Sequence, residues 1–464
     1  MPIKPTDLLD RLPSVAELLD RPPIRALAER WNKSVVAGGV RYFLDELRSD
    51  IERRAADLPS IRELAERAAR YVASRQHHSL GVGINATGSI FGSPWTSAPL
   101  AEIALERAIE SGREYGVSSG STADTSPAEL LPLLCRLTGA QAAVVVHSYP
   151  SAIWLALAAL ATDRDVLVAR AEVGDVGSTD SLPKLATAAY AILKEVGATN
   201  RSSAADYEAA ASPRAAAILK LSTDSYRVVG DTAAAEIEEL VAIARDRKML
   251  SIVALGVAPL VNPPASVAWP RRSAQASIAA GVDLVIIRGD GLVNGPSCGI
   301  LLGTQDVIAR IVAHPLFSGL QIDPLRAAAL TASIECYDGP TLGTDTLPVW
   351  QCLTTSIENL RNRAERLAAQ LAHVDGVAAA TAVETRSPLS SALTGDGWPS
   401  YGVALAPADS NIAALDNRLK SARFPIYGRI EADRLVLDLR TVLPRHDKTI
   451  VDSLLGAAPS DTTT

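Results

Sequence analysis

The sequence predicts an α/β protein whose largest domain is a mostly parallel sheet flanked by helices. From about residue 84 onward, short apolar runs alternate with amphipathic stretches such as "AAAEIEELVAIARDRKM", which is typical of strand–helix–strand units. The runs are rich in Val, Ile, Leu and Ala over their whole length, as expected for strands buried on both faces. The expected strands are "AAVVVH" (142–147), "DVLVAR" (165–170), "AAAILKLS" (215–222), "LSIVAL" (250–255) and "VDLVIIRG" (282–289).

Two smaller regions flank this sheet domain, which we place at residues 81–340. Residues 1–80 carry apolar side chains three and four positions apart, which predicts an N-terminal helical domain. Residues 341–458 combine a long helical pattern with weaker strands such as "YGVALA" and "RLVLDLR", which predicts a small α+β C-terminal domain. Residues 459–464, "PSDTTT", are expected to form a disordered tail.

Composition and charge argue against several classes of function. The chain has 45 Lys and Arg against 52 Asp and Glu, a formal charge of −7, so no overall field attracts DNA or a membrane surface. The first 80 residues hold 14 basic and 12 acidic side chains, and this excess is too small to indicate RNA binding by itself. The four Cys and six His lack metal-site spacing, so no metal is expected. No signal-peptide or membrane-span pattern is found, which predicts a cytoplasmic protein.

Ligands of parallel sheets bind outside the carboxyl ends of the strands, and three loops of this chain are expected there. They follow Val146, Leu255 and Ile287. The third loop, "RGDGLVNGPSCG" at residues 288–299, is rich in glycine, which lets a backbone approach a ligand closely. The site should therefore be sought around this loop.

Several long segments, in the same order along the chain, match the sequences of one known family over nearly the whole length. They are "INATG" (84–88), "LLCRLTGAQAAVVV" (133–146), "EVGATNRSSAADYEAA" (195–210), "ILKLSTDSYRVVGDT" (218–232), "GDGLVNGPSCGILLG" (289–303) and "IYGRIEADRLVLDLR" (426–440). On these segments the chain resembles the bacterial L-seryl-tRNA(Sec) selenium transferases, or selenocysteine synthases. The resemblance implies a fold-type I pyridoxal phosphate (PLP) transferase that forms a homodimer or higher homo-oligomer. It also implies a tRNA partner, which the charge of the N-terminal region does not support independently.

The family's two central catalytic positions are altered in this chain. The family pattern Gly-Asp-Lys-Leu-x-x-Gly-Pro, whose lysine forms the Schiff base with PLP, has Gly291 at the lysine position. No lysine occurs between Lys248 and Lys420, and Lys220 matches a separate family lysine. The aspartate that would pair with the pyridinium nitrogen is replaced by Ala254. Because a carboxylate keeps that nitrogen protonated, both losses argue against PLP catalysis of the family's type.

The remaining family positions outline a pocket without its charged groups. Ser148 and Ser151 lie where a helix start would hold the cofactor phosphate, although an ordinary helix start is the favoured interpretation. Asp290 and Gly295 keep their places in the glycine-rich loop. Ser318 and Gln321 stand where the family has basic residues for the selenium donor.

Three hypotheses for function follow. The first is a selenium transferase-like protein that has lost PLP catalysis and serves as a pseudoenzyme, scaffold or regulator. The second is an active L-seryl-tRNA(Sec) selenium transferase that makes selenocysteinyl-tRNA(Sec). The third is a different enzyme or a small-anion binder, holding PLP non-covalently or a phosphate-like anion in the old pocket. The first is favoured, because reactive positions are lost while Gly88, Gly139, Gly428, Arg429 and Arg440 of the family's scaffold remain.

Overall fold

The computed structural model describes residues 12–30, 33–53, 59–77, 83–91, 95, 97–113, 115, 128–177, 180–267, 269–389, 395, 397–409, 411–422 and 424–455. The predicted tail at 459–464 lies outside the described residues. The chain divides into two compact units, one of residues 1–84 with 417–426 and one of residues 85–416 with 427–464. The predicted boundary between 81–340 and 341–458 falls inside the second unit and stays a prediction.

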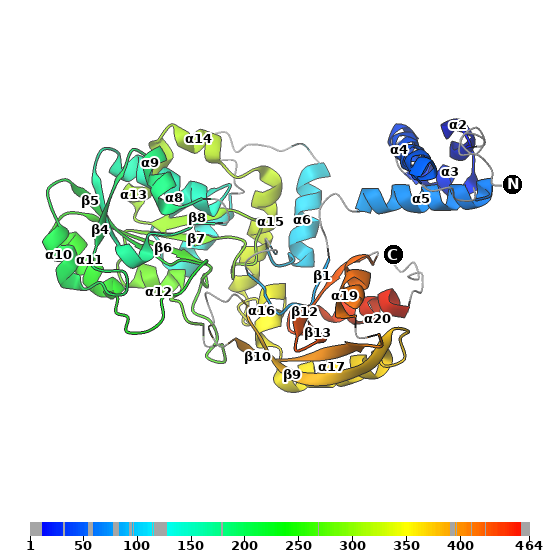
Figure 1. Cartoon of the computed structure of the whole chain (residues 1–464). Helices are drawn as coiled ribbons and strands as arrows, with labels where there is room; N and C mark the ends of the chain where they lie inside the picture. Colours follow the sequence, from blue (N-terminus) through cyan, green and yellow to red (C-terminus); the bar gives the residue numbers. More distant parts are fainter. Residues whose placement is uncertain are drawn as a thin grey trace. The chain divides into compact units, whose positions relative to one another are not determined.

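The first unit contains the predicted N-terminal helices (Figure 1). The helices pack through Leu18, Ile24, Val40, Leu44 and Leu64, all at most 1% exposed. The unit comprises α2 (Val15–Leu19), α3 (Pro22–Arg30), α4 (Lys33–Arg53) and α5 (Ile61–His77).

The second unit is built on a seven-stranded sheet with the strand order β2-β8-β7-β6-β5-β3-β4. Strand β8 runs antiparallel to both of its neighbours, and the other strand pairs are parallel. This confirms the predicted fold class. The strands are β2 (Ala142–Val146), β3 (Asp165–Ala169), β4 (Ile192–Val196), β5 (Ala215–Leu221), β6 (Leu250–Gly256), β7 (Leu284–Arg288) and β8 (Gly299–Gly303).

Helices cover both faces of this sheet (Figure 1). One face packs against α8 (Tyr149–Ala161), α9 (Leu182–Ala188), α13 (Gln305–Ala313) and α14 (Leu316–Leu320). The other face packs against α7 (Leu130–Thr138), α10 (Ala204–Ala210), α11 (Ile237–Asp246), α12 (Ala274–Ala279) and α15 (Pro324–Glu335). Burial on both faces is why these strands are continuously apolar.

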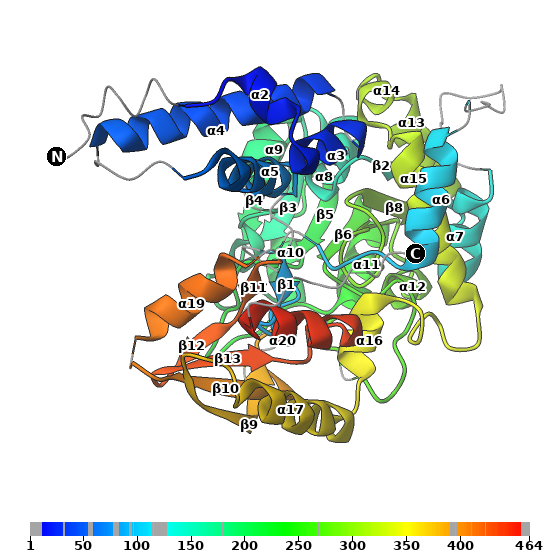
Figure 2. The same cartoon turned by 90° about the vertical axis from the view of Figure 1, so that its right-hand side faces the viewer.

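The helix α6 (Glu102–Arg113) lies alongside α15 in this unit (Figure 2). After α15 the chain continues through a short 3₁₀ turn (Cys336–Asp338) to α16 (Pro348–Thr354) and α17 (Ile357–Leu371). The helices of this region are therefore separated by turns rather than continuous. Further 3₁₀ turns lie at Arg170–Glu172 and Pro444–His446.

A second, antiparallel sheet of the order β12-β13-β10-β9 packs against α17. Its strands are β9 (Val377–Ser387), β10 (Trp398–Pro407), β12 (Arg429–Glu431) and β13 (Arg434–Asp438), and α20 (Asp447–Leu455) follows. Strands β1 (Ile84–Asn85) and β11 (Ile426–Tyr427) pair with each other, and α19 (Ile412–Lys420) precedes β11.

The scaffold residues retained from the family tie this second sheet to the "INATG" segment. Asp438 is fully buried and accepts hydrogen bonds from Ser387 Oγ at 2.8 Å, Ser400 Oγ at 2.7 Å and Arg429 Nη1 at 3.1 Å. Arg429 Nη1 also donates to the Thr87 carbonyl. Gly88 has a φ of +76°, and a β-carbon there would clash with Asp438. The packing around Asp438 therefore leaves no room for a side chain at position 88.

Candidate functional site at the carboxyl ends of the sheet

The glycine-rich loop after β7 is tightly shaped but carries no amine. The Gly295 amide donates to the Gly289 carbonyl at 2.8 Å, and the Asn294 amide donates to the Gly291 carbonyl at 3.1 Å. The Asn294 side chain also donates to the Pro99 carbonyl at 2.9 Å and accepts from the Val349 amide at 2.8 Å. Gly291 itself is buried. The loop is therefore held by its own backbone and its neighbours.

Ala254 lies on β6, and its side chain packs among buried apolar residues. Its strand neighbours are Leu221 and Ile286, and all three belong to the buried cluster under α8. The exposed fraction of Ala254 is 0%. Its methyl side chain offers no group that could hold a proton on a ring nitrogen.

Lys220 lies on the face of the sheet opposite to Ala254. It pairs with Val253 on β6, whereas its successor Leu221 pairs with Ala254, and successive strand residues point to opposite faces. Lys220 Nζ donates to Glu172 Oε1 at 3.3 Å and to the Ala235 carbonyl at 3.0 Å. Burial raises the pKa of Glu172, and the Lys220 charge opposes that rise. Lys220 is thus a structural lysine of the β5–α11 side.

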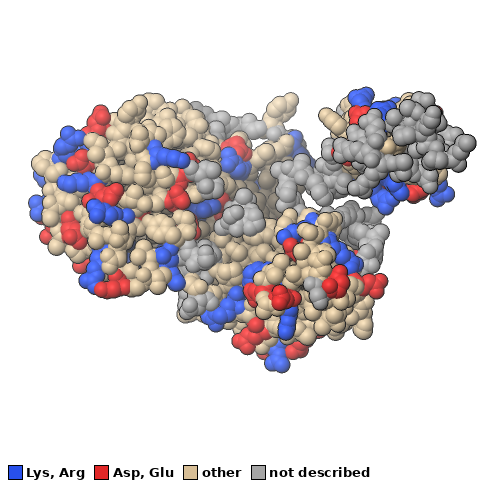
Figure 3. All heavy atoms as spheres, viewed as in Figure 1, with Lys and Arg blue, Asp and Glu red and all other residues tan. Residues whose placement is uncertain are grey.

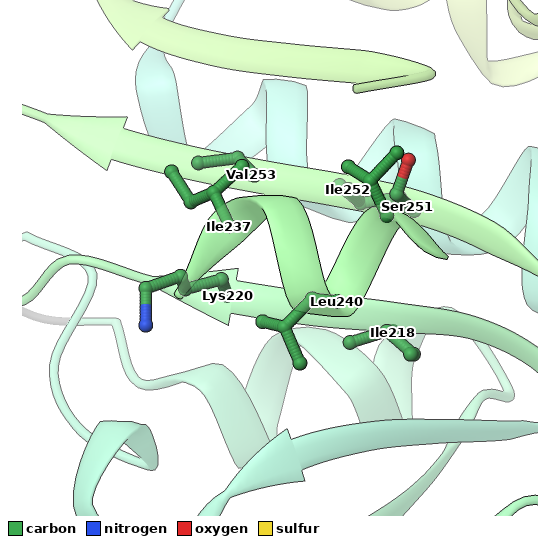
Figure 4. Close-up of a pocket in the computed structure, with 8 residues that line it drawn as sticks. Ile218, Lys220, Ile237, Leu240, Ser251, Ile252 and Val253 are labelled. Carbon is green, nitrogen blue, oxygen red and sulfur yellow. The ribbon is translucent and has the colours of Figure 1, made fainter. Parts of the chain in front are cut away.

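A pocket on this side is lined by β5, β6 and α11 (Figure 4). Its lining is apolar apart from Lys220 and Ser251, and the Lys220 amine points away from Ile252 and Val253. The Ser251 hydroxyl donates to Asp283 Oδ2 at 2.7 Å. The two polar residues of this pocket are engaged elsewhere, so we assign it no ligand.

The start of α8 places Ser148 and Ser151 together, and their hydroxyls are 2.7 Å apart. Ser148 is the N-cap, and its Oγ accepts the Ser151 amide at 3.3 Å. Ser151 Oγ is also 3.5 Å from His147 Nε2. This is the capping pattern of an ordinary helix start, with Pro150 in the first turn. The cofactor-binding role of the two serines stays a prediction.

The predicted donor-binding positions lie on and after α14 and carry no charge. Ser318 is exposed, and its Oγ donates to the Pro315 carbonyl at 3.1 Å. Gln321 is half-buried and forms a bridge to Val146 at the end of β2. Neither residue supplies the positive charge that an anionic donor requires.

A chain of four charged side chains, which the sequence analysis missed, occupies the strand ends near Ala254. Asp224 follows β5 and accepts a hydrogen bond from Arg271 Nη1. Asp224 Oδ2 is also 3.6 Å from Arg288 Nη1, at the end of β7. Arg288 in turn holds the predicted site residue Asp290 through two bonds, Nε to Oδ1 at 3.0 Å and Nη2 to Oδ2 at 3.2 Å. We call Arg271, Asp224, Arg288 and Asp290 the charge chain.

A signal for the charge chain was present in the sequence. Arg288 comes directly after the apolar run "VDLVII", and Asp224 comes three residues after the end of "AAAILKL". The carboxyl ends of parallel strands lie at the same edge of a sheet, so charged residues that follow them can meet there. The third member, Arg271, lies 15 residues beyond the end of β6 at Gly256 (271 − 256 = 15), so only the folded loop places it there.

Other kinds of site find no support in the part of the chain that the structure describes. Within it, no group of three or more His, Cys, Asp or Glu side chains could hold a metal ion. No helix among those residues is long and apolar enough to cross a bilayer. On the face of the second unit seen in Figure 3, blue and red side chains are interspersed rather than gathered by sign.

Comparison with known proteins decides the family. A sequence model described as L-seryl-tRNA selenium transferase matches residues 83–443. The chain belongs to the L-seryl-tRNA selenium transferase family. Curated relatives named L-seryl-tRNA(Sec) selenium transferase include one from Hyphomonas neptunium, 32% identical over 97% of this chain and 99% of the relative. Another, from Rhizobium meliloti, is 33% identical over 94% of this chain and 95% of the relative.

A solved structure similar to this member of the selenium transferase family supports the fold. D-glucosaminate-6-phosphate ammonia-lyase superposes with a TM-score of 0.58 at 18% identity, covering 82% of this chain and 97% of that chain. The likeness confirms the fold-type I transferase architecture inferred from the sequence. At this identity it carries no information about substrate.

Proposed function

We propose that this chain is a selenium transferase-like protein that has lost PLP-dependent catalysis and acts as a scaffold or regulator. The observation that carries the proposal is that neither of the two positions matched to a family lysine provides an available amine at the strand ends. Gly291 stands at the position of the family's Schiff-base lysine. Lys220, the other lysine that matches the family, is engaged by Glu172 on the opposite face of the sheet.

The residues present do not fit PLP. Ala254 is packed among apolar side chains and cannot pair with a pyridinium nitrogen. The charge chain brings two guanidinium groups to the strand ends, but both are paired with carboxylates. The serines at the start of α8 bond to each other and to the helix backbone. Together these features support loss of the family's chemistry.

Spectroscopy with the purified full chain tests this proposal. An imine between PLP and a lysine absorbs between about 330 and 430 nm. Borohydride reduces this imine to a secondary amine, which fixes the PLP to the lysine. We expect no reducible adduct and no labelled peptide by mass spectrometry, in a titration run beside a PLP enzyme with an intact lysine. A reduced adduct on Lys220 or any other single lysine would contradict the proposal.

The remaining functions predict different results in assays of the same protein. An active transferase would convert seryl-tRNA(Sec) in the presence of a selenium donor, as the relatives' names describe for those proteins. A small-anion binder would bind PLP or phosphate saturably without a covalent adduct. We expect neither conversion nor saturable anion binding.

Partners are the remaining part of the proposal. tRNA is a partner by analogy with the relatives' names, and a gel-shift titration with seryl-tRNA(Sec) tests it. In the N-terminal unit, Arg48 and Arg67 pair with Asp45 and Glu63 at 2.8 Å, which reduces the positive charge available to RNA. We also propose a cytoplasmic location.

We propose further that the chain associates with itself through the outer side of α6 and α15. Leu105 and Ile109, one turn apart on α6, are 41% and 53% exposed. Leu325 on α15 is 48% exposed and lies beside Gly112 at the end of α6. Neighbouring exposed apolar side chains of this size are typical of protein interfaces.

A further inference from the structure

The charge chain crosses the carboxyl end of β6, the strand that carries Ala254. Strand β6 lies between β5 and β7 in the sheet. Asp224 comes from the end of β5 and Arg288 from the end of β7, yet their charged atoms are 3.6 Å apart. Since neighbouring strands are about 4.8 Å apart, these two side chains must meet above the end of β6.

The backbone at the carboxyl end of β6 is hydrogen-bonded to members of the charge chain. The Val257 amide donates to Asp224 at 3.2 Å and 3.3 Å, to Oδ1 and Oδ2. Arg271 Nη1 donates to the Leu255 carbonyl at 3.2 Å, and Arg271 Nη2 donates to the Thr223 carbonyl. Three strand ends and the loop that carries Arg271 are thereby joined through two guanidinium groups.

The charge chain is shielded from water and balanced in charge. The exposed fractions of its side chains are 8% for Asp290, 14% for Arg271, 24% for Arg288 and 25% for Asp224. It contains two cations and two anions, and its attractions outweigh burial to raise the pKa of Arg288. Pairs this sheltered interact more strongly than surface pairs, and removal of one partner leaves an uncompensated charge.

We propose that the charge chain takes the place of the cofactor: it occupies the strand ends that the family uses for PLP and joins β5, β6 and β7 without any ligand. This inference rests on the proposed loss of PLP chemistry and goes beyond it. It explains how the strand ends stay closed when Gly291 and Ala254 supply no polar side chain. It also means that the lost lysine is not the only obstacle to PLP.

Thermal unfolding of the full chain without PLP tests the structural half of the proposal. Arg271→Met removes one cation of the charge chain, and the neighbouring Arg272→Met is the matched control. Arg272 pairs with Glu238 at 2.7 Å, but those side chains are 34% and 55% exposed. We expect Arg271→Met to lower the melting midpoint by at least about 4 °C and Arg272→Met by less than about 1 °C.

Asp224→Asn provides a milder second variant, because an amide oxygen can still accept the Val257 amide while the charge is lost. We expect Asp224→Asn to lower the melting midpoint by less than Arg271→Met does and by more than Arg272→Met does. If Arg271→Met and Asp224→Asn melt no lower than Arg272→Met, the charge chain does not hold the strand ends and the proposal is overturned.

Restoration of the family residues tests the second half of the proposal, that the charge chain excludes PLP. Gly291→Lys with Ala254→Asp, while the charge chain is intact, should yield no borohydride-fixed PLP adduct. The same two changes combined with Asp224→Asn and Arg288→Ser should yield one adduct per chain, on the new lysine. An adduct in the two-residue variant, or none in a folded four-residue variant, would show that the charge chain does not exclude PLP. If either variant fails to fold, the melting comparison decides.

The proposed function can fail independently of this inference. An adduct in the unaltered chain would contradict the loss of PLP chemistry. A normal melting midpoint in the charge-chain variants would contradict the inference while leaving that loss untouched.

Discussion

The backbone of Gly256 lies so close to the Asp224 carboxylate that a β-carbon there would come within 2.6 Å of Oδ2. Gly256 also has a φ of +61°, a backbone conformation that residues other than glycine rarely adopt. The last residue of β6 is thus a glycine for two physical reasons, its positive φ and the closeness of the Asp224 carboxylate, and the second comes from the charge chain.

Gly256→Ala should therefore be strongly destabilising, whereas Gly291→Ala should be tolerated. We expect Gly256→Ala to lower the free energy of unfolding by about 2–4 kcal/mol, from the strained φ together with the clash. Gly291 is not at a positive φ, and its β-carbon would meet Val257 at 3.4 Å, an ordinary contact. Urea denaturation followed by circular dichroism measures both. Equal losses in the free energy of unfolding would mean that the backbone at position 291 also requires glycine.

Tyr149→Phe should leave stability unchanged or raise it slightly. The Tyr149 hydroxyl is buried and makes no hydrogen bond of normal geometry among the described residues, although the Gly256 backbone lies near it, so its removal costs little and relieves a poorly satisfied group. The control is Tyr337→Phe, because the Tyr337 hydroxyl donates to the Leu292 carbonyl at 2.6 Å and accepts from Trp350 Nε1 at 2.8 Å. We expect the control to lose about 1–3 kcal/mol in urea denaturation. A comparable loss in Tyr149→Phe would reveal a partner for that hydroxyl.

Lys220→Met should destabilise the fold without affecting any response to PLP. It leaves Glu172 with its side chain 14% exposed and without its cation, for which we expect a loss of about 2 kcal/mol. Arg170→Met is the matched control, because the Arg170–Glu195 pair is 51% and 45% exposed and should contribute less than about 0.5 kcal/mol. Both are read from urea midpoints, with PLP absorbance recorded in parallel. A change in PLP absorbance on losing Lys220 would place that lysine in a cofactor site.

Stability should fall on mild acidification, partly through His446. Burial lowers the pKa of His446, and the neighbouring Arg445 lowers it further. The unfolded chain then takes up the proton first, so the His446 contribution is lost as the pH falls below about 6.5. His446→Gln should reduce the drop in melting midpoint between pH 7.5 and about 5.5. An identical drop in the two proteins would assign the pH dependence to other groups.

Ile109→Glu should disrupt self-association if α6 forms the interface. A buried carboxylate in an apolar contact is costly, so the variant should shift toward monomer in light scattering coupled to gel filtration. Ile430→Glu on β12 is the matched control, because Ile109 and Ile430 are both 53% exposed. An unaltered mass for Ile109→Glu, or an equal shift for the control, would place the interface elsewhere or exclude one.

Much of the sheet could be predicted because buried parallel strands carry a strong local signal. The five expected strands correspond to β2, β3, β5, β6 and β7. The two missed strands lack that signal for different reasons. Strand β4 is an edge strand with the exposed residues Lys194 and Glu195, and β8 is a five-residue segment bounded by Gly299 and Gly303. Propensity alone does not reveal such strands, because their neighbours stabilise them.

The sequence by itself determined the family, the fold class and the altered positions at Gly291 and Ala254, because motifs and apolar periodicity are local properties of the chain. Only the tertiary structure decided that Lys220 faces away from Ala254 and that Arg271, Asp224, Arg288 and Asp290 meet above β6. The longest of those contacts, between Asp224 and Arg288, joins residues 64 positions apart (288 − 224 = 64). Strand order and loop conformation bring such residues together, and neither is encoded in a local pattern.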